Sequence, residues 1–108
     1  FNVHHFPKIQ NFIATNNEFK NIKEFTFENF TQLIFLNIER NKIELISIES
    51  FYGLFNLTDL NLAYNLLKKV NKHLFSRMSN LNSLNLFKNI IEIIEEESFA
   101  PNKNLNQL

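Results

Sequence analysis

The sequence predicts a single repeat solenoid of the α/β type, with short parallel strands on a concave face and mostly irregular or short-helical returns on a convex face. Two observations predict it. An asparagine recurs every 24 residues, at Asn17, Asn41, Asn65 and Asn89. With Leu33 as position 1 of a unit, apolar residues also recur at positions 1, 4, 6, 11, 14, 19 and 22. Over four units 27 of these 28 positions are apolar, in a chain that is only 44% hydrophobic.

The four full units cover residues 9–32, 33–56, 57–80 and 81–104. Residues 1–8 fit the tail of a preceding unit, and residues 105–108 fit the start of a following one. We therefore expect residues 1–108 to be either one segment of a longer solenoid or a very reduced solenoid of the same kind. The single exception to the apolar pattern is Asn102, at position 22 of the last unit. Either the back of that unit bulges outward or the regular array ends there.

Positions 3 to 7 of each unit alternate between expected exposed positions and apolar inward positions, which is the pattern of a half-buried strand. We expect strands near residues 11–14, 35–38, 59–62 and 83–86, stacked in parallel about 4.8 Å apart. The rest of each unit carries a second apolar set across the back of the sheet. No unit can enclose its own apolar side chains, so each depends on its neighbours.

The recurring asparagine at position 9 follows the strand, where the chain turns inward and leaves backbone groups outside the sheet ladder. A carboxamide both donates and accepts, so Asn17, Asn41, Asn65 and Asn89 are predicted to form a structural ladder between units. Position 19 is always phenylalanine. We expect this column to form a core spine near the convex side, and its members are Phe27, Phe51, Phe75 and Phe99.

The complete spacing is L-x-x-L-x-L-x-x-N-x-[IL]-x-x-[IVL]-x-x-x-x-F-x-x-[LFM], and it resembles the 24-residue "typical" subclass of the leucine-rich repeat family. The resemblance covers residues 9–104. It implies a leucine-rich repeat solenoid that binds another protein, most often on the concave face. This subclass is similar to animal extracellular receptors of the Toll-like and Slit-like type. The implied role is therefore part of an extracellular or cell-surface receptor, in adhesion or innate immune recognition.

The chain contains no cysteine, although the caps of such ectodomains are usually rich in cysteine. The alternative role is accordingly an intracellular scaffold or adaptor in the cytoplasm, capped in another way. A second open question concerns glycans. Asn29-Phe30-Thr31 and Asn56-Leu57-Thr58 are sequons for N-glycosylation, and they would be used only in a secreted protein.

The exposed positions of the strand and of the turn after it are the candidates for a partner site. Aromatic and arginine side chains anchor many interfaces. The predicted partner-binding residues are Phe35, Glu39, Arg40, Asp59, Tyr64, Phe87 and Lys88. The alternative is that they are ordinary surface residues of a phenylalanine-rich chain. At position 5, Asn37, Asn61 and Asn85 form a second column, which either stacks, meets a polar partner, or only fills the surface.

Charge and composition exclude other classes. Eleven basic residues balance eleven acidic ones, which gives no reason to expect nucleic acid or an anionic membrane as a partner.

Position 12 alternates in sign through Lys20, Glu44, Lys68 and Glu92, so neighbouring units are expected to pair there.

No cluster of histidine and carboxylate residues has the spacing of a metal or catalytic site, and the only glycine is Gly53. Nothing in the sequence predicts an enzyme, a cofactor, a metal or a small-molecule substrate. We do expect self-association through uncapped ends, where apolar residues should be exposed; these are Val3, Phe6, Ile9, Leu105 and Leu108.

Overall fold

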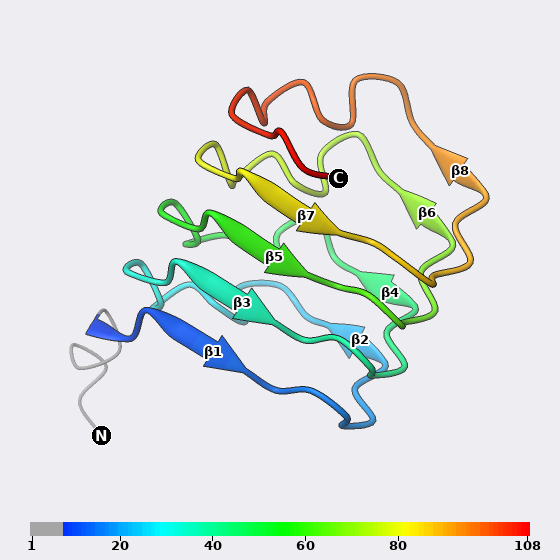
Figure 1. The fold of residues 1–108 in the computed structure, drawn as a ribbon, viewed down its shortest axis with the longest axis horizontal. Coiled ribbons are helices and arrows are strands. Elements are labelled where there is room, and N and C mark those ends of the chain that lie inside the picture. The colour runs from blue at the N-terminus through cyan, green and yellow to red at the C-terminus, as the bar shows by residue number, and fades with distance from the viewer. Residues whose placement is uncertain (1–7) are drawn as a thin grey trace.

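The 24-residue period becomes one coil of backbone per unit, and four such coils stack one above another from β1 to β7 (Figure 1). The computed structural model describes residues 8–108, with extents of 41 × 31 × 21 Å. We call residues 9–32, 33–56, 57–80 and 81–104 coils 1 to 4. The predicted solenoid is confirmed. The predictions for Val3 and Phe6 lie outside the described residues.

Each coil contributes one three-residue strand to a parallel sheet of order β1-β3-β5-β7. These strands are β1 (Asn11–Ile13), β3 (Phe35–Asn37), β5 (Asp59–Asn61) and β7 (Ser83–Asn85). The register advances by 24 residues from strand to strand, as Leu36 opposite Leu60 shows. All four strands lie where the alternation predicted them, and each ends one residue earlier. Gln107 pairs with Ser83 in parallel, at the β7 edge of the sheet.

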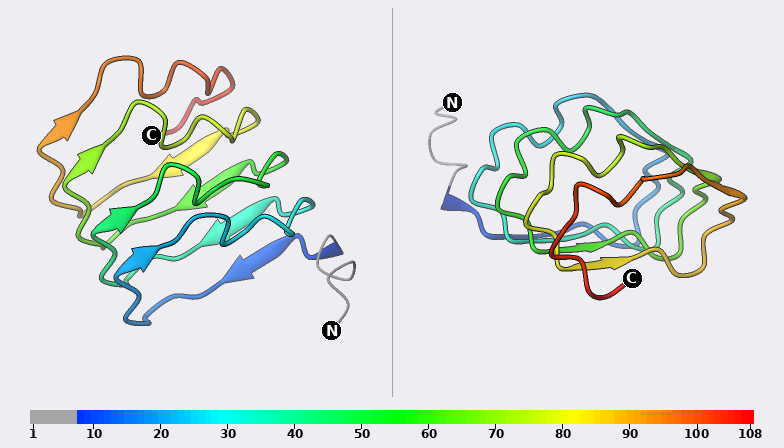
Figure 2. Two further views of the ribbon diagram at one scale, coloured as in Figure 1. Left: turned by 180° about the vertical axis from the view of Figure 1, so that it is seen from behind. Right: turned by 90° about the horizontal axis from the view of Figure 1, so that it is seen from above.

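The returning half of each coil contains a second, two-residue strand that the sequence analysis did not predict (Figure 2). These strands are β2 (Asn21–Ile22), β4 (Leu45–Ile46), β6 (Lys69–Val70) and β8 (Ile93–Ile94). The rest of the returns consists of turns, and residues 8–108 contain no α-helix. No helix in this described part is long and apolar enough to cross a membrane.

The core fills the space between the two sets of strands. Its interior includes a stack of the position-19 rings, which run through all four coils almost parallel to one another. Phe27 and Phe51 lie 6.3 Å apart at 17°, Phe51 and Phe75 6.1 Å apart at 17°, and Phe75 and Phe99 5.9 Å apart at 12°. Phe51 and Phe75 are completely buried. The predicted spine is confirmed, and its geometry is a continuous stack.

The short return strands pair as β2-β4 and as β6-β8, but β4 and β6 do not pair. The residue at position 18 differs in the same way. Ser50 donates to Ile22 O of the preceding coil at 2.6 Å, and Ser98 Oγ lies 3.5 Å from Val70 O. Coil 3 has Leu74 at this position, which is buried and has no hydroxyl group to bond Ile46 O. A cavity of about 450 Å³ lies at this break, and Ile46, Lys69 and Leu74 are among its lining residues.

Gly53 lies where the backbones of two coils come close together. Its φ of +103° is one that side-chain-bearing residues rarely adopt, and an added Cβ would lie 2.6 Å from Glu28 Cα in coil 1. The only glycine of the chain therefore stands where the backbone of coil 2 passes directly over coil 1.

The outermost coils show what stacking supplies to the inner ones. Val70 is completely buried in coil 3, whereas its counterpart in coil 4, Ile94, is 53% exposed. Leu108 is 70% exposed. Ile9 and Leu105, which were also expected to be exposed, are half-buried because they pack against the core. The apolar rim expected at the C-terminal side is thus present and is formed largely by coil 4.

Asn102 does not push the back of coil 4 outward. It is 4% exposed, and its Nδ2 donates to Phe75 O at 2.9 Å and to Met78 O at 3.0 Å. The suggestion of an outward bulge is wrong, because the carboxamide replaces the apolar contact with two hydrogen bonds to the coil below.

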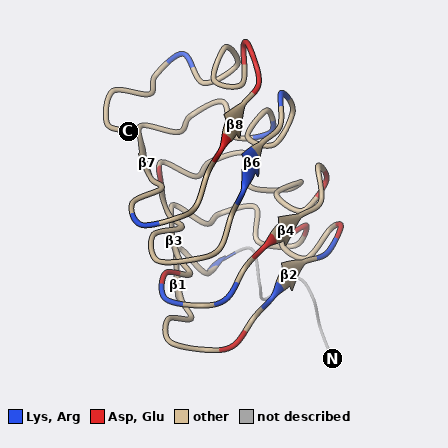
Figure 3. Cartoon of the chain, turned by 90° about the vertical axis from the view of Figure 1, so that its right-hand side faces the viewer, with Lys and Arg blue, Asp and Glu red and all other residues tan. Residues whose placement is uncertain are grey.

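Charges alternate in sign from β2 to β8 on the side shown in Figure 3, as position 12 predicted. However, none of the position-12 residues forms an ion pair in the described structure. The ion pairs there join Glu18 to Lys42, Glu49 to Arg77 and Glu95 to Lys69. The expected pairing at position 12 is wrong, because the register sets which backbones are neighbours but leaves flexible charged side chains free to point elsewhere.

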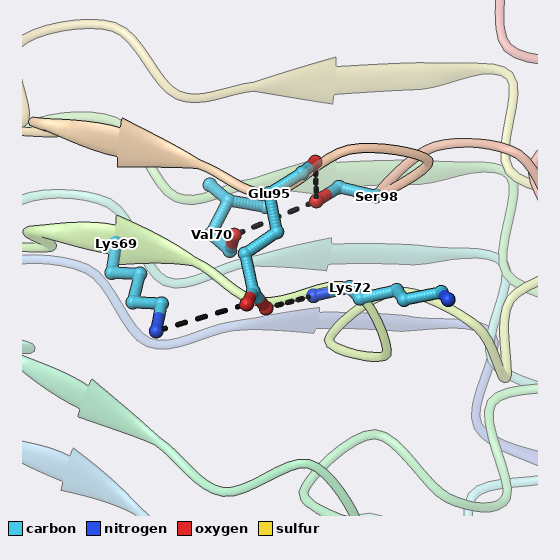
Figure 4. Close-up of polar contacts among 5 residues, drawn as sticks. All are labelled: Lys69, Val70, Lys72, Glu95 and Ser98. Carbon is cyan, nitrogen blue, oxygen red and sulfur yellow. Dashed lines mark hydrogen bonds and ion pairs between the residues drawn. The ribbon is translucent and has the colours of Figure 1, made fainter.

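Glu95 makes the most extensive of these polar links (Figure 4). One carboxylate oxygen accepts the backbone N–H of Lys72 at 2.7 Å, and the other lies 3.9 Å from Lys69 Nζ. The side chain therefore joins coil 4 to coil 3 beside the Ser98 contact with Val70 O.

Candidate functional site

The position-9 asparagines fix each coil on the one before it. Asn65 Nδ2 donates to Leu62 O at 3.0 Å within its own coil and to Ile38 O at 3.2 Å in the preceding coil. Its Oδ1 accepts the backbone N–H of Ile43 at 3.1 Å, also in the preceding coil. Asn89 repeats these contacts with Leu86, Leu62 and Leu67.

The first two asparagines of this ladder are less fully bonded. Asn41 donates to Ala14 O of coil 1, but its buried Oδ1 has no partner. Asn17 is exposed and donates only to Thr15 O, within its own coil.

The position-5 asparagines close the turn at the end of each strand. Asn61 Oδ1 accepts the backbone N–H of Ala63 at 2.9 Å. Asn37 bonds Glu39 in the same way at 3.0 Å, and Asn85 bonds Phe87 at 2.9 Å. This is the Asx turn, in which a short amide replaces a backbone acceptor. The second asparagine column is therefore neither surface filler nor a stack of amides.

The residue at position 8, directly after the one whose N–H the Asx turn bonds, adopts a left-handed backbone conformation in every coil. The φ values are 57° for Asn16, 60° for Arg40, 55° for Tyr64 and 56° for Lys88. The backbone N–H of Arg40 donates to Ala63 O at 3.0 Å, and that of Tyr64 donates to Phe87 O at 2.8 Å. Residues of this kind are uncommon at positive φ. Arg40 and Tyr64 each have both an Asx turn before them and this hydrogen bond to the next coil.

Four of the predicted partner-binding residues meet along this edge of the sheet. The Arg40 guanidinium carbon lies 4.0 Å from the centre of the Tyr64 ring, and the Tyr64 and Phe87 rings pack edge to face at 5.8 Å and 81°. Lys88 Nζ lies 5.6 Å from the Phe87 ring centre. We call Arg40, Tyr64, Phe87 and Lys88 the edge ridge. Tyr64 is 37% exposed and Phe87 58%.

The other three predicted residues are placed differently. Phe35 and Asp59 are partners in the β3-β5 register, at the opposite end of the strands from the ridge, and both are half-buried. Asp59 Oδ2 accepts the Thr58 hydroxyl at 2.9 Å. Glu39 is half-buried and immediately precedes Arg40. The structure thus separates the seven residues into a continuous ridge and a half-buried group.

The two sequon asparagines also differ. Asn29 is exposed, and its side chain makes no hydrogen bond. Asn56 is exposed too, but its Nδ2 donates to Thr31 O of the preceding coil at 2.9 Å. Asn80 makes the equivalent bond to Phe55 O. Asn56 therefore belongs to a third set of links between coils.

Among residues 8–108, no three histidine or carboxylate side chains gather as metal ligands would. The edge ridge and the position-5 asparagines lie along the strands β3, β5 and β7 and the turns that follow them. This surface offers aromatic rings, two cations and amides, which are groups for recognition.

Comparisons with known proteins agree with this geometry. A family model described as "Leucine rich repeat" matches residues 7–67 and 55–108. A chain in the glycosylated form of the Drosophila Toll–Spatzle complex superposes with a TM-score of 0.90 at 27% identity, covering 94% of this chain and 14% of that one. A chain in another structure of the Toll–Spatzle complex superposes with a TM-score of 0.87 over 96% of this chain and 14% of that one. Its identity is 18%, so it shows the fold alone.

The chain therefore spans 14% of the length of each of these solved chains. A comparison with curated proteins found no match.

Proposed function

The chain belongs to the leucine-rich repeat family, and from that premise we propose that it is a protein-recognition segment whose concave sheet and edge ridge bind another protein. The observation that carries the proposal is the ridge itself. Four side chains from three coils contact one another in a continuous row, on a backbone fixed by hydrogen bonds between coils. A surface that is already ordered loses little conformational freedom when a partner binds.

The proposed setting is an extracellular or cell-surface receptor that acts in recognition or adhesion. Two features support it: the similarity to chains of the Toll–Spatzle complex, described as a hub in development and innate immunity, and the exposed sequon at Asn29. The absence of cysteine favours a second candidate, an intracellular scaffold or adaptor that uses the same face.

We also propose that the apolar rim of coil 4 supports self-association. Ile93, Ile94 and Leu108 are all more than half exposed, and Phe99 is only partly buried there. An apolar patch of this kind commonly marks a surface that another molecule covers. Sedimentation of the purified chain tests this point: a concentration-dependent dimer that Ile94→Lys dissolves is expected, and a monomer at all concentrations would contradict it.

The binding function is tested by screening the 108-residue chain against displayed libraries of secreted and of cytosolic proteins. A partner from the secreted library is expected under the first setting, and a partner from the cytosolic library under the second. The partner should lose at least tenfold in affinity with Phe35→Ala or Tyr64→Ala. Lys20→Ala and Lys68→Ala are the matched controls, since both side chains are exposed and form no ion pair.

A partner whose binding depends on Lys20 or Lys68, and not on Phe35 or Tyr64, would refute recognition by this face.

A further inference from the structure

We infer that the edge ridge recognises an extended acidic segment of the partner, with two carboxylates that flank an apolar side chain. This deepens the proposed function and rests on it. It names the chemistry of the partner at the ridge, where the preceding proposal named only the surface.

The cations of the ridge are not neutralised within the described structure. Its ion pairs involve Lys42, Lys69 and Arg77, and neither Arg40 nor Lys88 belongs to any of them. Both side chains are exposed, and each lies against an aromatic ring. A guanidinium that rests on a ring keeps its N–H groups at the edge, where they can bind a carboxylate in two places.

The middle of the ridge is apolar. Between the two cations lie the rings of Tyr64 and Phe87, in edge-to-face contact at 5.8 Å. Phe87 is 58% exposed and so has ring surface left to cover. An apolar residue of the partner that packs here would remove water from both neighbouring ion pairs, which strengthens them.

The spacing of the cations fits an extended chain. Arg40 and Lys88 occupy the same position two coils apart, and parallel strands are about 4.8 Å apart, which places the two positions roughly 10 Å apart. Three residues of a segment in the polyproline II conformation, which is extended and has three residues per turn, span about 9 Å and return the side chain to the same face. The favoured segment therefore has acidic residues three positions apart, with an apolar residue between them.

Glu39 allows the sign of the partner's charge to be tested on the same surface. At positions 7 and 8 of the four coils it is the only carboxylate, against the two cations. It precedes Arg40, and its side chain forms no ion pair in the described structure. Its charge should oppose an acidic partner while the cations attract one, so removing Glu39 and removing Arg40 should have opposite effects.

The test is an NMR titration of the isotope-labelled 108-residue chain with the blocked peptide glutamate-phenylalanine-alanine-glutamate at low salt. Shifts are expected at the amides of Arg40, Tyr64, Phe87 and Lys88, and the peptide with glutamines in place of both glutamates should cause none. Arg40→Gln and Lys88→Gln should each weaken binding about threefold, and Glu39→Gln should strengthen it about twofold. Lys20→Gln and Lys68→Gln should change nothing.

Three results would overturn the inference: no shift along the ridge, changes of the same sign for Arg40→Gln and Glu39→Gln, or a ridge that binds a heparin tetrasaccharide but not the peptide. Thermal unfolding of each variant separates lost binding from lost folding. If the peptide fails while a protein partner still depends on Phe35 and Tyr64, the proposed function stands and only the acidic specificity is rejected. If the peptide binds but the partner depends on Lys20 or Lys68, the proposed function is the part that fails.

Discussion

The backbone N–H of Ile43 donates to the side-chain oxygen of Asn65, 22 residues further along, at 3.1 Å. The two residues belong to neighbouring coils, so a side chain of one coil completes the backbone hydrogen bonding of another. Asn65 returns the link by donating to Ile38 O. Stacking in this molecule is thus specified by directed polar bonds as well as by burial of apolar surface.

Asn65→Ala should lower the free energy of unfolding by at least about 2 kcal/mol, because it leaves the buried Ile43 N–H and several carbonyls without partners. Asn17→Ala is the matched control. Asn17 is exposed and bonds only Thr15 O, so its loss should cost less than about 0.5 kcal/mol. Urea unfolding measures both, and equal losses would show that the ladder does not act between coils.

Phe51→Ala should cost about 3–5 kcal/mol, because the ring is completely buried between Phe27 and Phe75 and its removal opens a cavity. The same change at Phe99 should cost less than half as much, since that ring is stacked on one side only and is partly exposed. Chemical denaturation of the two variants gives the comparison. A loss below about 1 kcal/mol at Phe51 would be incompatible with the ring stack.

The backbone amides of Lys68, Lys69 and Asn71 should exchange with deuterium faster than those of their counterparts in coils 2 and 4. In coil 4, Glu92, Ile93 and Glu95 donate to Lys68 O and Val70 O, but coil 3 makes no such bonds to β4. Hydrogen exchange followed by NMR reads each amide separately. Equal protection in all three coils would mean that β4 and β6 pair in solution.

Asn29 should carry a glycan when the chain is secreted from a eukaryotic cell behind a signal peptide. Its side chain is exposed and makes no hydrogen bond, so an attached sugar displaces no contact. Mass spectrometry before and after glycosidase treatment measures occupancy, with Asn29→Gln as the variant that removes it. If the untreated mass of the Asn29→Gln variant differs from that of the unchanged chain only by the methylene group that the substitution adds, the prediction is contradicted.

The positions of the concave strands followed from the sequence because an alternation of period two is forced by a half-buried strand, as in Phe35–Asn37. The stack of phenylalanine rings at position 19 was predicted because every coil has a large apolar ring there that must be buried. The paired return strands were missed because two residues, such as Lys69–Val70, are too short for any pattern to show. The ion pairs were mispredicted because the register fixes which backbones are neighbours, but not where flexible charged ends meet.

The candidate site was partly visible. Residue type and position identified Arg40, Tyr64, Phe87 and Lys88, but the sequence could not show that they contact one another. That contact depends on the left-handed backbone at position 8. The signal for it was present in the column of Asn37, Asn61 and Asn85, since asparagine is the residue that closes an Asx turn two positions on. The placement of Leu74 beside the unpaired strands β4 and β6 needed the structure, because its serine counterparts lie near carbonyls 28 residues away.

The most direct test of coil-on-coil stacking, and of the ridge built on it, is the NMR coupling transmitted through the hydrogen bond between the Tyr64 amide nitrogen and the Phe87 carbonyl carbon. The atoms belong to successive coils, and the structure places the nitrogen 2.8 Å from the carbonyl oxygen. A coupling between Tyr64 and Phe87 is the predicted result. A coupling from the Tyr64 amide to a carbonyl within its own coil would contradict the register and the ridge together.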